Sequence, residues 1–151
     1  MMLLIIGFLF MVFILVVVGA LSGMLMMFID LPSILLILVP LLFFVITSKS
    51  GNILSMYIKT SFKKNYSYIE SELAALSGAI KNTIKFTLGV GGFGFVSGLL
   101  ACLVNLDNKD MLGPSLALSL LAFLYAVAVS VFIFLPTKAW AENKINLLKQ
   151  K

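Results

Sequence analysis

The sequence predicts an all-α membrane protein with four transmembrane helices, and three observations lead to this fold class. The chain has 151 residues, of which 62% are hydrophobic and only 11% are charged, whereas soluble domains average about 25% charged residues. Its mean hydropathy is +1.16. Four apolar runs approach or exceed the length of about 20 residues that a helix needs to cross a bilayer. We therefore expect a single four-span membrane domain over residues 1–151.

The first two spans are expected at Leu3 to Phe28 and at Ile34 to Thr47. The first run contains no charged residue. A cleaved signal peptide is the alternative, but the run lacks a basic n-region and exceeds the usual apolar length of about 7–15 residues. Between the two spans, Asp30 to Ser33 predicts a short turn, in which Pro32 suits a helix start. The second span is short, and Pro40 predicts a kink inside it.

The segment between the second and third spans, Ser48 to Phe86, is too polar to lie in lipid. Its apolar residues recur at the spacing of one helix face: Ile69, Leu73, Leu76, Ile80 and Ile84. Ser67 or Ser71 is a suitable helix cap. We expect cytoplasmic helices over about 48–86 that prolong spans two and three. An amphipathic helix lying in the membrane interface is the alternative, and the sequence does not separate the two.

The third span is expected at Leu88 to Leu106 and the fourth at Ser115 to Leu135. Gly113 and Pro114 predict a turn just before the fourth span. Pro136 predicts another turn just after it, because the residue before a proline disfavours the helical conformation.

The distribution of lysine predicts the orientation of the spans. All eleven basic residues are lysines. Six lie between spans two and three and four lie in the tail, 137–151, whereas only Lys109 lies between spans three and four. Because basic residues concentrate in cytoplasmic loops, we expect both termini in the cytoplasm and the two acidic turns outside.

Composition excludes several classes of function. With no histidine and with one cysteine, Cys102, inside an apolar run, we expect no metal, no cofactor and no disulfide framework. The net charge of +5 does not indicate nucleic acid, because the lysines flank spans. Lys49, Lys63 and Lys64 are instead expected to contact anionic lipid. An enzyme is not expected, since the spans contain no buried pair of acids.

Small residues recur along spans three and four at steps of three and four. They are Gly91, Gly94 and Gly98 on the third span, and Ser115, Ser119, Ala122, Ala126 and Ser130 on the fourth. In lipid, such residues let helix backbones approach closely. The simplest interpretation is that these stripes pack the two spans together, within one subunit or between subunits. A narrow pore lined by small residues is the alternative. No Asp, Glu or Lys lies deep inside a span, so the chain alone has no proton carrier.

Several stretches resemble the MotA/TolQ/ExbB family, in its MotA branch. LGPSLALSLLAFLYAVAVSVFIFLP, Leu112 to Pro136, resembles the fourth span of that branch, and FIDLPSILLILVP, Phe28 to Pro40, resembles the start of its second span. GFVSGL, Gly94 to Leu99, stands where the family often has GTVxGL, and NILSMYIKTSFKK, Asn52 to Lys64, resembles its first cytoplasmic helix. The resemblance covers nearly all four spans in order, and the fourth-span motif is its most specific part.

The resemblance implies a bacterial inner-membrane complex. In this family, five subunits form a ring around two copies of a single-span partner of the MotB, ExbD or TolR kind, which has an essential Asp in its span. Proton or sodium flow between ring and partner turns the ring. The function implied is therefore that of a stator-like subunit in an ion-driven motor, and the partner would supply the carboxylate that this chain lacks.

Two departures from the family bear on this function. The segment Ser48 to Phe86 is much shorter than the MotA insertion and lacks the Arg and Glu motif that meets the flagellar rotor. We therefore expect a different cargo. The second departure concerns the pore: the family's threonine of span three corresponds to Phe95, and its threonine pair of span four corresponds to Ala122 and Phe123.

Pore-lining candidates are thus Phe95, Ala122 and Phe123, with Ser97 and Ser119 as the remaining hydroxyls. Five inward-facing phenylalanines would form an apolar constriction, which stops conduction by dewetting. A slight rotation of span four would instead turn Phe123 toward lipid or a neighbouring helix. The alternative function is therefore a non-conducting oligomeric membrane scaffold derived from the same family.

Overall fold

The computed structural model describes residues 2–21, 23, 30–48, 55, 69–104, 106–107 and 109–150. Within these residues all the regular secondary structure is helical, so the all-α prediction is confirmed for them. The helices are α1 (Met2–Leu21), α2 (Leu31–Thr47), α4 (Glu70–Val104) and a long C-terminal rod. The rod consists of α5 (Lys109–Val129), one π-helical turn, η2 (Ser130–Phe134), and α6 (Leu135–Lys149).

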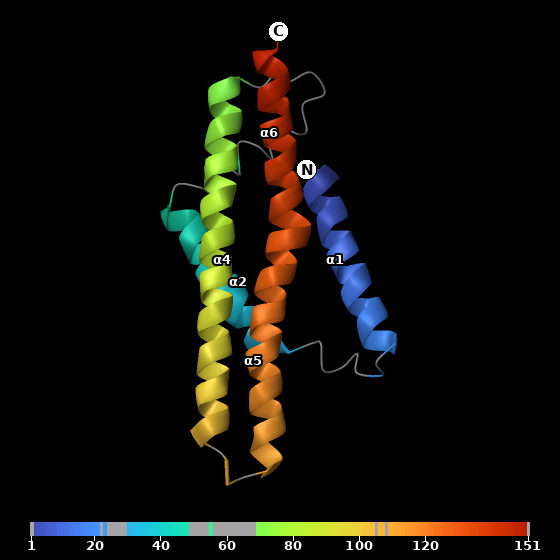
Figure 1. Cartoon of the computed structure of the whole chain (residues 1–151), viewed down its shortest axis with the longest axis vertical. Helices are drawn as coiled ribbons and strands as arrows, with labels where there is room; N and C mark the ends of the chain where they lie inside the picture. Colours follow the sequence, from blue (N-terminus) through green and yellow to red (C-terminus); the bar gives the residue numbers. More distant parts are fainter. Residues whose placement is uncertain are drawn as a thin grey trace.

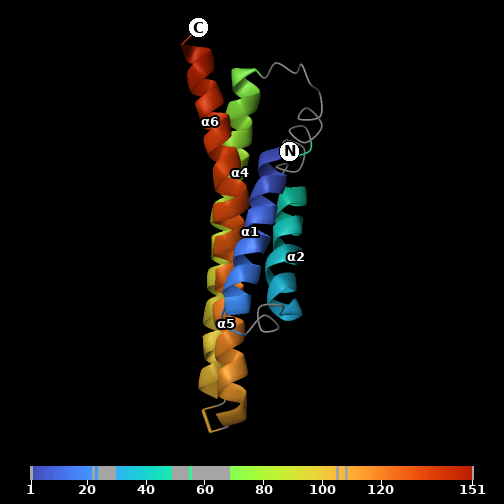
Figure 2. The same ribbon diagram turned by 90° about the vertical axis from the view of Figure 1, so that its right-hand side faces the viewer.

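The C-terminal rod and α4 form a long antiparallel hairpin, and the two shorter helices lie beside it (Figure 1). The helix α2 packs against both α4 and α5, while α1 packs mainly against η2 (Figure 2). The hairpin is therefore the centre of the described fold, and it positions α1 and α2.

Two helices are long and apolar enough to cross a membrane, namely Glu70–Val104 and the part of the rod from Asp110 to Lys149. Two shorter apolar helices cover Ile5–Leu21 and Leu31–Thr47. The first helix was expected to reach Phe28, but α1 ends at Leu21, and residues 24–29 lie outside the described part of the chain. The helix α2 passes through Pro40 without ending.

The predicted turn at Asp30 to Ser33 is in fact the first turn of α2. The Asp30 carboxylate accepts a hydrogen bond of 2.9 Å from the backbone N–H of Ser33 and so caps the helix. Pro32 lies in the first turn, where the missing N–H of a proline costs no intrahelical hydrogen bond. The start of the helix was therefore placed three residues too late.

The predicted turn at Gly113 and Pro114 is also wrong, because both residues lie inside α5. The helix begins at Lys109 and has Asp110 in its first turn, where a negative charge is favourable. Pro114 is the sixth residue of this helix, so the helix continues past it without the hydrogen bond that its N–H would donate.

Pro136 likewise lies within continuous helix rather than in a turn. A proline has no N–H, so the carbonyl of Phe132, four residues earlier, loses its usual α-helical donor. The preceding turn is π-helical, with the N–H of Leu135 donating to the carbonyl of Ser130. Gly7 of α1 covers the Phe132 carbonyl so closely that a Cβ at residue 7 would lie 3.1 Å from its carbon. The rod thus passes Pro136 through a wider, π-helical turn, against which Gly7 of α1 packs closely.

The first half of α4 continues the predicted third span as one helix. Its apolar stripe faces the rod: Leu73, Leu76 and Ile80 are buried against Phe134 and Ala141. Because these apolar residues are already buried against the rod, they are not available to face lipid. The packing therefore favours the helix that prolongs span three over the amphipathic helix lying in the membrane interface. The corresponding extension of α2 and Ser67 fall outside the described residues.

The helix cap of α4 differs from the expected serine. Ser71 lies inside the helix. The backbone N–H of Ile69, just before α4, donates to the Glu72 carboxylate at 3.2 Å. A carboxylate reaching back to the start of a helix is half of a capping box.

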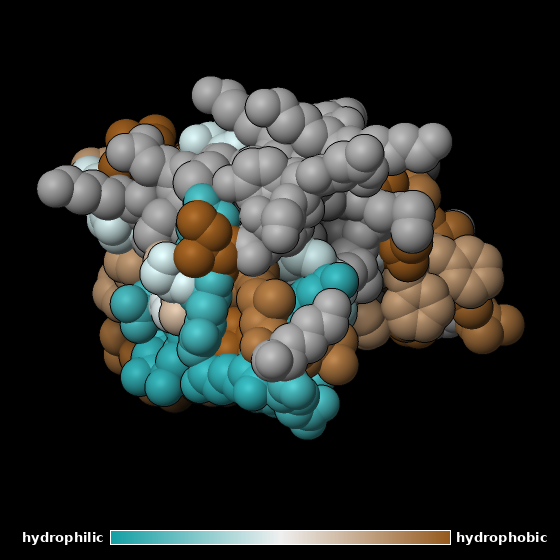
Figure 3. All heavy atoms as spheres, turned by 90° about the horizontal axis from the view of Figure 1, so that it is seen from above, coloured by the Kyte–Doolittle hydropathy of each residue, from teal (hydrophilic) through white to brown (hydrophobic). Residues whose placement is uncertain are grey.

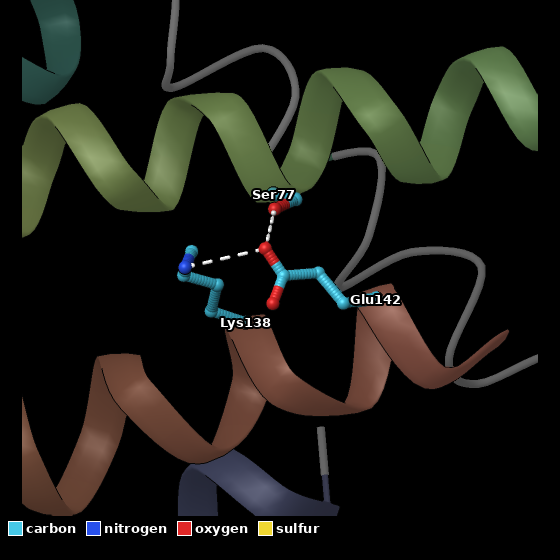
Figure 4. A network of polar contacts seen from close by, with 3 residues as sticks. All are labelled: Ser77, Lys138 and Glu142. Atoms are coloured by element: carbon cyan, nitrogen blue, oxygen red, sulfur yellow. Dashed lines mark hydrogen bonds and ion pairs between the residues drawn. The ribbon is translucent and has the colours of Figure 1, made fainter. Parts of the chain in front are cut away.

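A hydrogen bond and an ion pair join α4 to α6 at the end of the molecule where α6 finishes. The Ser77 hydroxyl donates to Glu142 Oε1 at 3.0 Å, and Lys138 Nζ lies 3.2 Å from the same oxygen (Figure 4). Lys149 Nζ lies 3.3 Å from Glu70 Oε1. Seen from this end, hydrophilic side chains gather together, with hydrophobic ones to their side (Figure 3). This end of the hairpin is therefore suited to water, unlike the middle of its length, where exposed side chains such as Phe93 and Leu120 are apolar.

The first prediction concerns the pH dependence of this contact. The hydrogen bond from Ser77 and the nearby Lys138 lower the pKa of Glu142 below its ordinary value of 4.5. A carboxylate whose pKa is lowered in the folded chain stabilises the fold at pH values above its ordinary pKa of 4.5. This stabilisation is lost as the pH falls through the pKa of the folded chain. We expect the thermal midpoint in detergent to be higher for the wild type than for Glu142→Gln at neutral pH, with the difference vanishing on acidification below about pH 4.5.

Ser77→Ala is the matched control, because it removes the main cause of the lowered pKa. When Glu142→Gln is compared with its parent in the Ser77→Ala background, the part of the difference in thermal midpoint that depends on pH should be smaller. A difference between wild type and Glu142→Gln that stays constant across the acidic range would contradict this account.

Candidate functional site

The candidate site is the seam where α4 meets α5, because the small residues of the sequence come together there. A Cβ placed on Gly98 would lie 2.6 Å from Ser119 Cβ and 2.7 Å from Ser119 Cα. On Gly94 it would lie 2.9 Å from Ala122 Cβ. Real Cβ atoms do not approach this closely, so only glycine fits at these positions.

A third contact continues the seam, since Gly91 lies against Ala126 in the same manner. Each step of three or four residues along α4 is matched by a similar step backward along α5, as two antiparallel helices require. The structure therefore places Gly91, Gly94, Gly98 and Ala126 in helix packing within one subunit, which is one of the two arrangements that the sequence left open.

Two predicted pore-lining residues lie inside this seam. Ser119 is fully buried, and its hydroxyl donates to the carbonyl of Phe95 at 2.7 Å. Ala122 is 2% exposed and lies against Gly94. Neither residue lines a pore while α4 and α5 stay packed. The expectation failed because small residues that fill a helix seam follow the same spacing as small residues that line a pore.

The helix α2 covers one edge of the seam. Leu36 lies against Gly94, where a Cβ would be 2.7 Å from its Cδ2, and Ile37 packs against Tyr125 and Ala126. Val90 packs against the same cluster, and Ser97, seven residues later, shares its helix face. The Ser97 hydroxyl donates to the carbonyl of Gly94 at 3.0 Å. Ser97 therefore belongs to the α2 side of the seam.

Phe95 and Phe123 meet at the opposite edge. Their ring centroids are 6.0 Å apart and the rings are inclined by 51°, a separation within the range of favourable aromatic pairs. Phe95 is partly buried, and Phe123 keeps 44% of its surface exposed. The structure thus brings Phe95 and Phe123 together on the edge that faces away from α2.

A row of buried hydroxyls extends the seam beyond Gly91. Thr83 and Thr87 donate to carbonyls of their own helix, Ala79 and Thr83, at 2.9 and 2.8 Å. Ser130 is different: among the described residues its hydroxyl is the buried side-chain group with no hydrogen-bond partner. It lies in the π-helical turn, and such turns are enriched at functional sites.

Sequence reasoning missed the two threonines. They continue the spacing of Leu76 and Ile80 toward Gly91, which is the signal that reveals them. Because these two hydroxyls bond to carbonyls of their own helix and a threonine hydroxyl does not ionise near neutral pH, they provide packing rather than a proton carrier. No group of acids, cysteine or histidine within the described ranges is arranged to hold a metal ion.

Comparisons with known proteins give no match, whether with protein-family models, with curated proteins or with solved structures.

The second prediction tests the tightness of the seam. Gly98→Ala should lower the thermal midpoint, because the added Cβ meets the Ser119 backbone and overpacking costs about 1–3 kcal/mol. Gly92→Ala on the same helix is the matched control, since no described atom lies within 4 Å of its added Cβ. The control should be neutral or stabilising, because alanine favours a helix over glycine by about 1 kcal/mol. Equal midpoints for the two variants in one detergent would refute the close seam.

Proposed function

We propose that the chain is a MotA-like ring subunit of an ion-driven, bacterial inner-membrane motor complex. It acts with a single-span partner that has an Asp in its span, and the ion is a proton or sodium. The observation on which this rests most is the two-sided seam: α2 covers one edge, and the other presents Phe95 and Phe123. A helix pair whose seam has one edge covered by α2 and one edge exposed is suited to a ring in which α4 and α5 face the axis.

Placement in a membrane is supported by the apolar surface of the helices. Large hydrophobic side chains are exposed on each of them, for example Phe13 on α1, Phe43 on α2, Phe93 on α4 and Leu120 on α5. Exposed apolar surface on this scale indicates contact with lipid or with other subunits. With the lysine-rich segments on one side, the topology is that of a multi-pass protein with both termini in the cytoplasm.

The need for a partner follows from the residues of the seam. The serine and threonine hydroxyls along it, which include those of Ser97 and Ser119, do not ionise near neutral pH. An ion-driven cycle therefore takes its carboxylate from a second chain. The open edge at Phe95 and Phe123 is where a single apolar span would lie beside α4 and α5.

A non-conducting scaffold is the second candidate, and burial of the seam favours it. Ser119 and Ala122 are buried in the subunit, so the open edge at this level offers phenylalanine rather than hydroxyl groups. Five such pairs around an axis would form an apolar constriction, which blocks ions by dewetting. The two candidates share the ring and differ in whether a partner occupies it.

The third prediction concerns the assembly. Native mass spectrometry of the full chain, extracted gently from its own membranes, should give five copies together with two copies of a small single-span protein. The sequence of that protein should have an Asp in its span. A closed homo-oligomer with nothing inside would select the scaffold, and a monomer would contradict both candidates.

The fourth prediction concerns the constriction. If Phe123 faces the axis, Phe123→Thr should raise ion leak through vesicles that contain the ring, because a hydroxyl allows water into the constriction. Phe93→Thr is the matched control: Phe93 is 71% exposed on α4 and, two residues from Phe95, points about 200° away from it. Leak that is unchanged in Phe123→Thr, or equal in the two variants, would count against Phe123 as the plug.

A further inference from the structure

The helices α2 and α4 line an open groove of about 830 Å³ on the α2 side of the α4–α5 seam. Its walls are largely aromatic: Phe44 and Phe86 stack with ring centroids 4.3 Å apart and an angle of 12°, and Phe93 lines the groove from α4. Gly89 forms part of the lining, and a Cβ there would meet no described atom within 4 Å. The groove is therefore apolar and open at its middle.

One end of the groove is polar. The helices run antiparallel, because Leu36 lies at Gly94 and Phe44 at Phe86. Ser48, at the end of α2, is thus placed with Asn82 and Lys85 at one end of the groove. Pro40 and Phe93 lie toward the other end. The lining changes from a cation and polar groups to hydrocarbon along its length.

We propose that this groove binds one molecule of an anionic phospholipid. An acyl chain lies along Phe44, Phe86 and Phe93, and the lipid phosphate lies at Lys85 and Asn82. A lysine ammonium and an amide are suitable donors for phosphate oxygens, and an apolar protein helix would leave the ammonium of Lys85 without an anion. Lys85 stands three residues before the expected start of the third span at Leu88, which is the level of lipid head groups.

The inference rests on the proposed membrane location but not on the motor or on the ring. It assigns a particular lysine and a particular groove to the lipid. The expectation from sequence placed the lipid contacts at Lys49, Lys63 and Lys64, all of which lie outside the described residues.

The test measures lipid retention by native mass spectrometry on the full chain in mild detergent, titrated with phosphatidylglycerol or with phosphatidylcholine of the same acyl chains. The wild type should bind phosphatidylglycerol more tightly. Lys85→Gln should weaken that binding about fivefold, the factor that corresponds to about 1 kcal/mol for one lysine at an anionic head group. Lys81→Gln is the matched control, because Lys81 is on the same helix and does not line the groove.

A second pair of variants tests the apolar part. Gly89→Leu should remove the retained lipid of both kinds, because the new side chain occupies the groove. Gly78→Leu, also on α4 and also with no described atom within 4 Å of its Cβ, should leave retention unchanged. An unaltered thermal midpoint for Gly89→Leu separates loss of lipid from loss of fold.

Three results would overturn the proposal. Equal effects of Lys85→Gln and Lys81→Gln would remove the head-group site, and equal retention in Gly89→Leu and Gly78→Leu would remove the acyl-chain site. A Gly89→Leu variant that changes the oligomer mass without changing lipid would assign the groove to a second copy of the chain. Alkaline extraction of native membranes is a separate check: release of the chain into the supernatant would refute the membrane location itself.

Discussion

Three glycines of α4 allow α5 to approach until helix backbones and small side chains are in contact, and the position of the other described helices depends on that approach. A Cβ at Gly98 would overlap Ser119, and one at Gly94 would overlap both Ala122 and Leu36 of α2. In the proposed membrane location, helices gain little from the hydrophobic effect between them, so such close contact becomes the main source of their association. The seam therefore fixes the hairpin, and the hairpin fixes where α2 packs.

Close packing also decides what the hairpin is able to do. The residues that fill the seam are unavailable to line a channel, so the surface left for a partner or for a second copy is the edge with Phe95 and Phe123. The other edge is covered by α2 near Gly94 and opens into the aromatic groove near Phe86. One hairpin thus offers an apolar surface on one side and a groove with a cationic end on the other.

The sequence was sufficient to predict the helices and the glycine stripe, because hydropathy and three- to four-residue spacing report directly on burial. The sequence failed to predict the conformation at Gly113, Pro114 and Pro136. These residue types favour turns, but here the helices continue through them. At Pro136 the helix continues through a π-helical turn, and Gly7 of α1, which is distant in sequence, packs against the carbonyl of Phe132. The roles of Ser119 and Ala122 were wrong for a different reason, since the pattern gives the spacing of small residues and not the face that looks outward.

The most direct test of the account is an inter-subunit distance measured between spin labels. In a Cys102→Ala background, a label at Phe123→Cys is compared with a label at Leu35→Cys. Leu35 is exposed on α2 and is next to Leu36, which contacts Gly94, so the two labels lie at a similar level of the hairpin. If the open edge of the seam faces the axis of a ring, the distance between copies is shorter for the label at residue 123. A shorter distance for the label at residue 35 would place α2 at the axis and contradict the account.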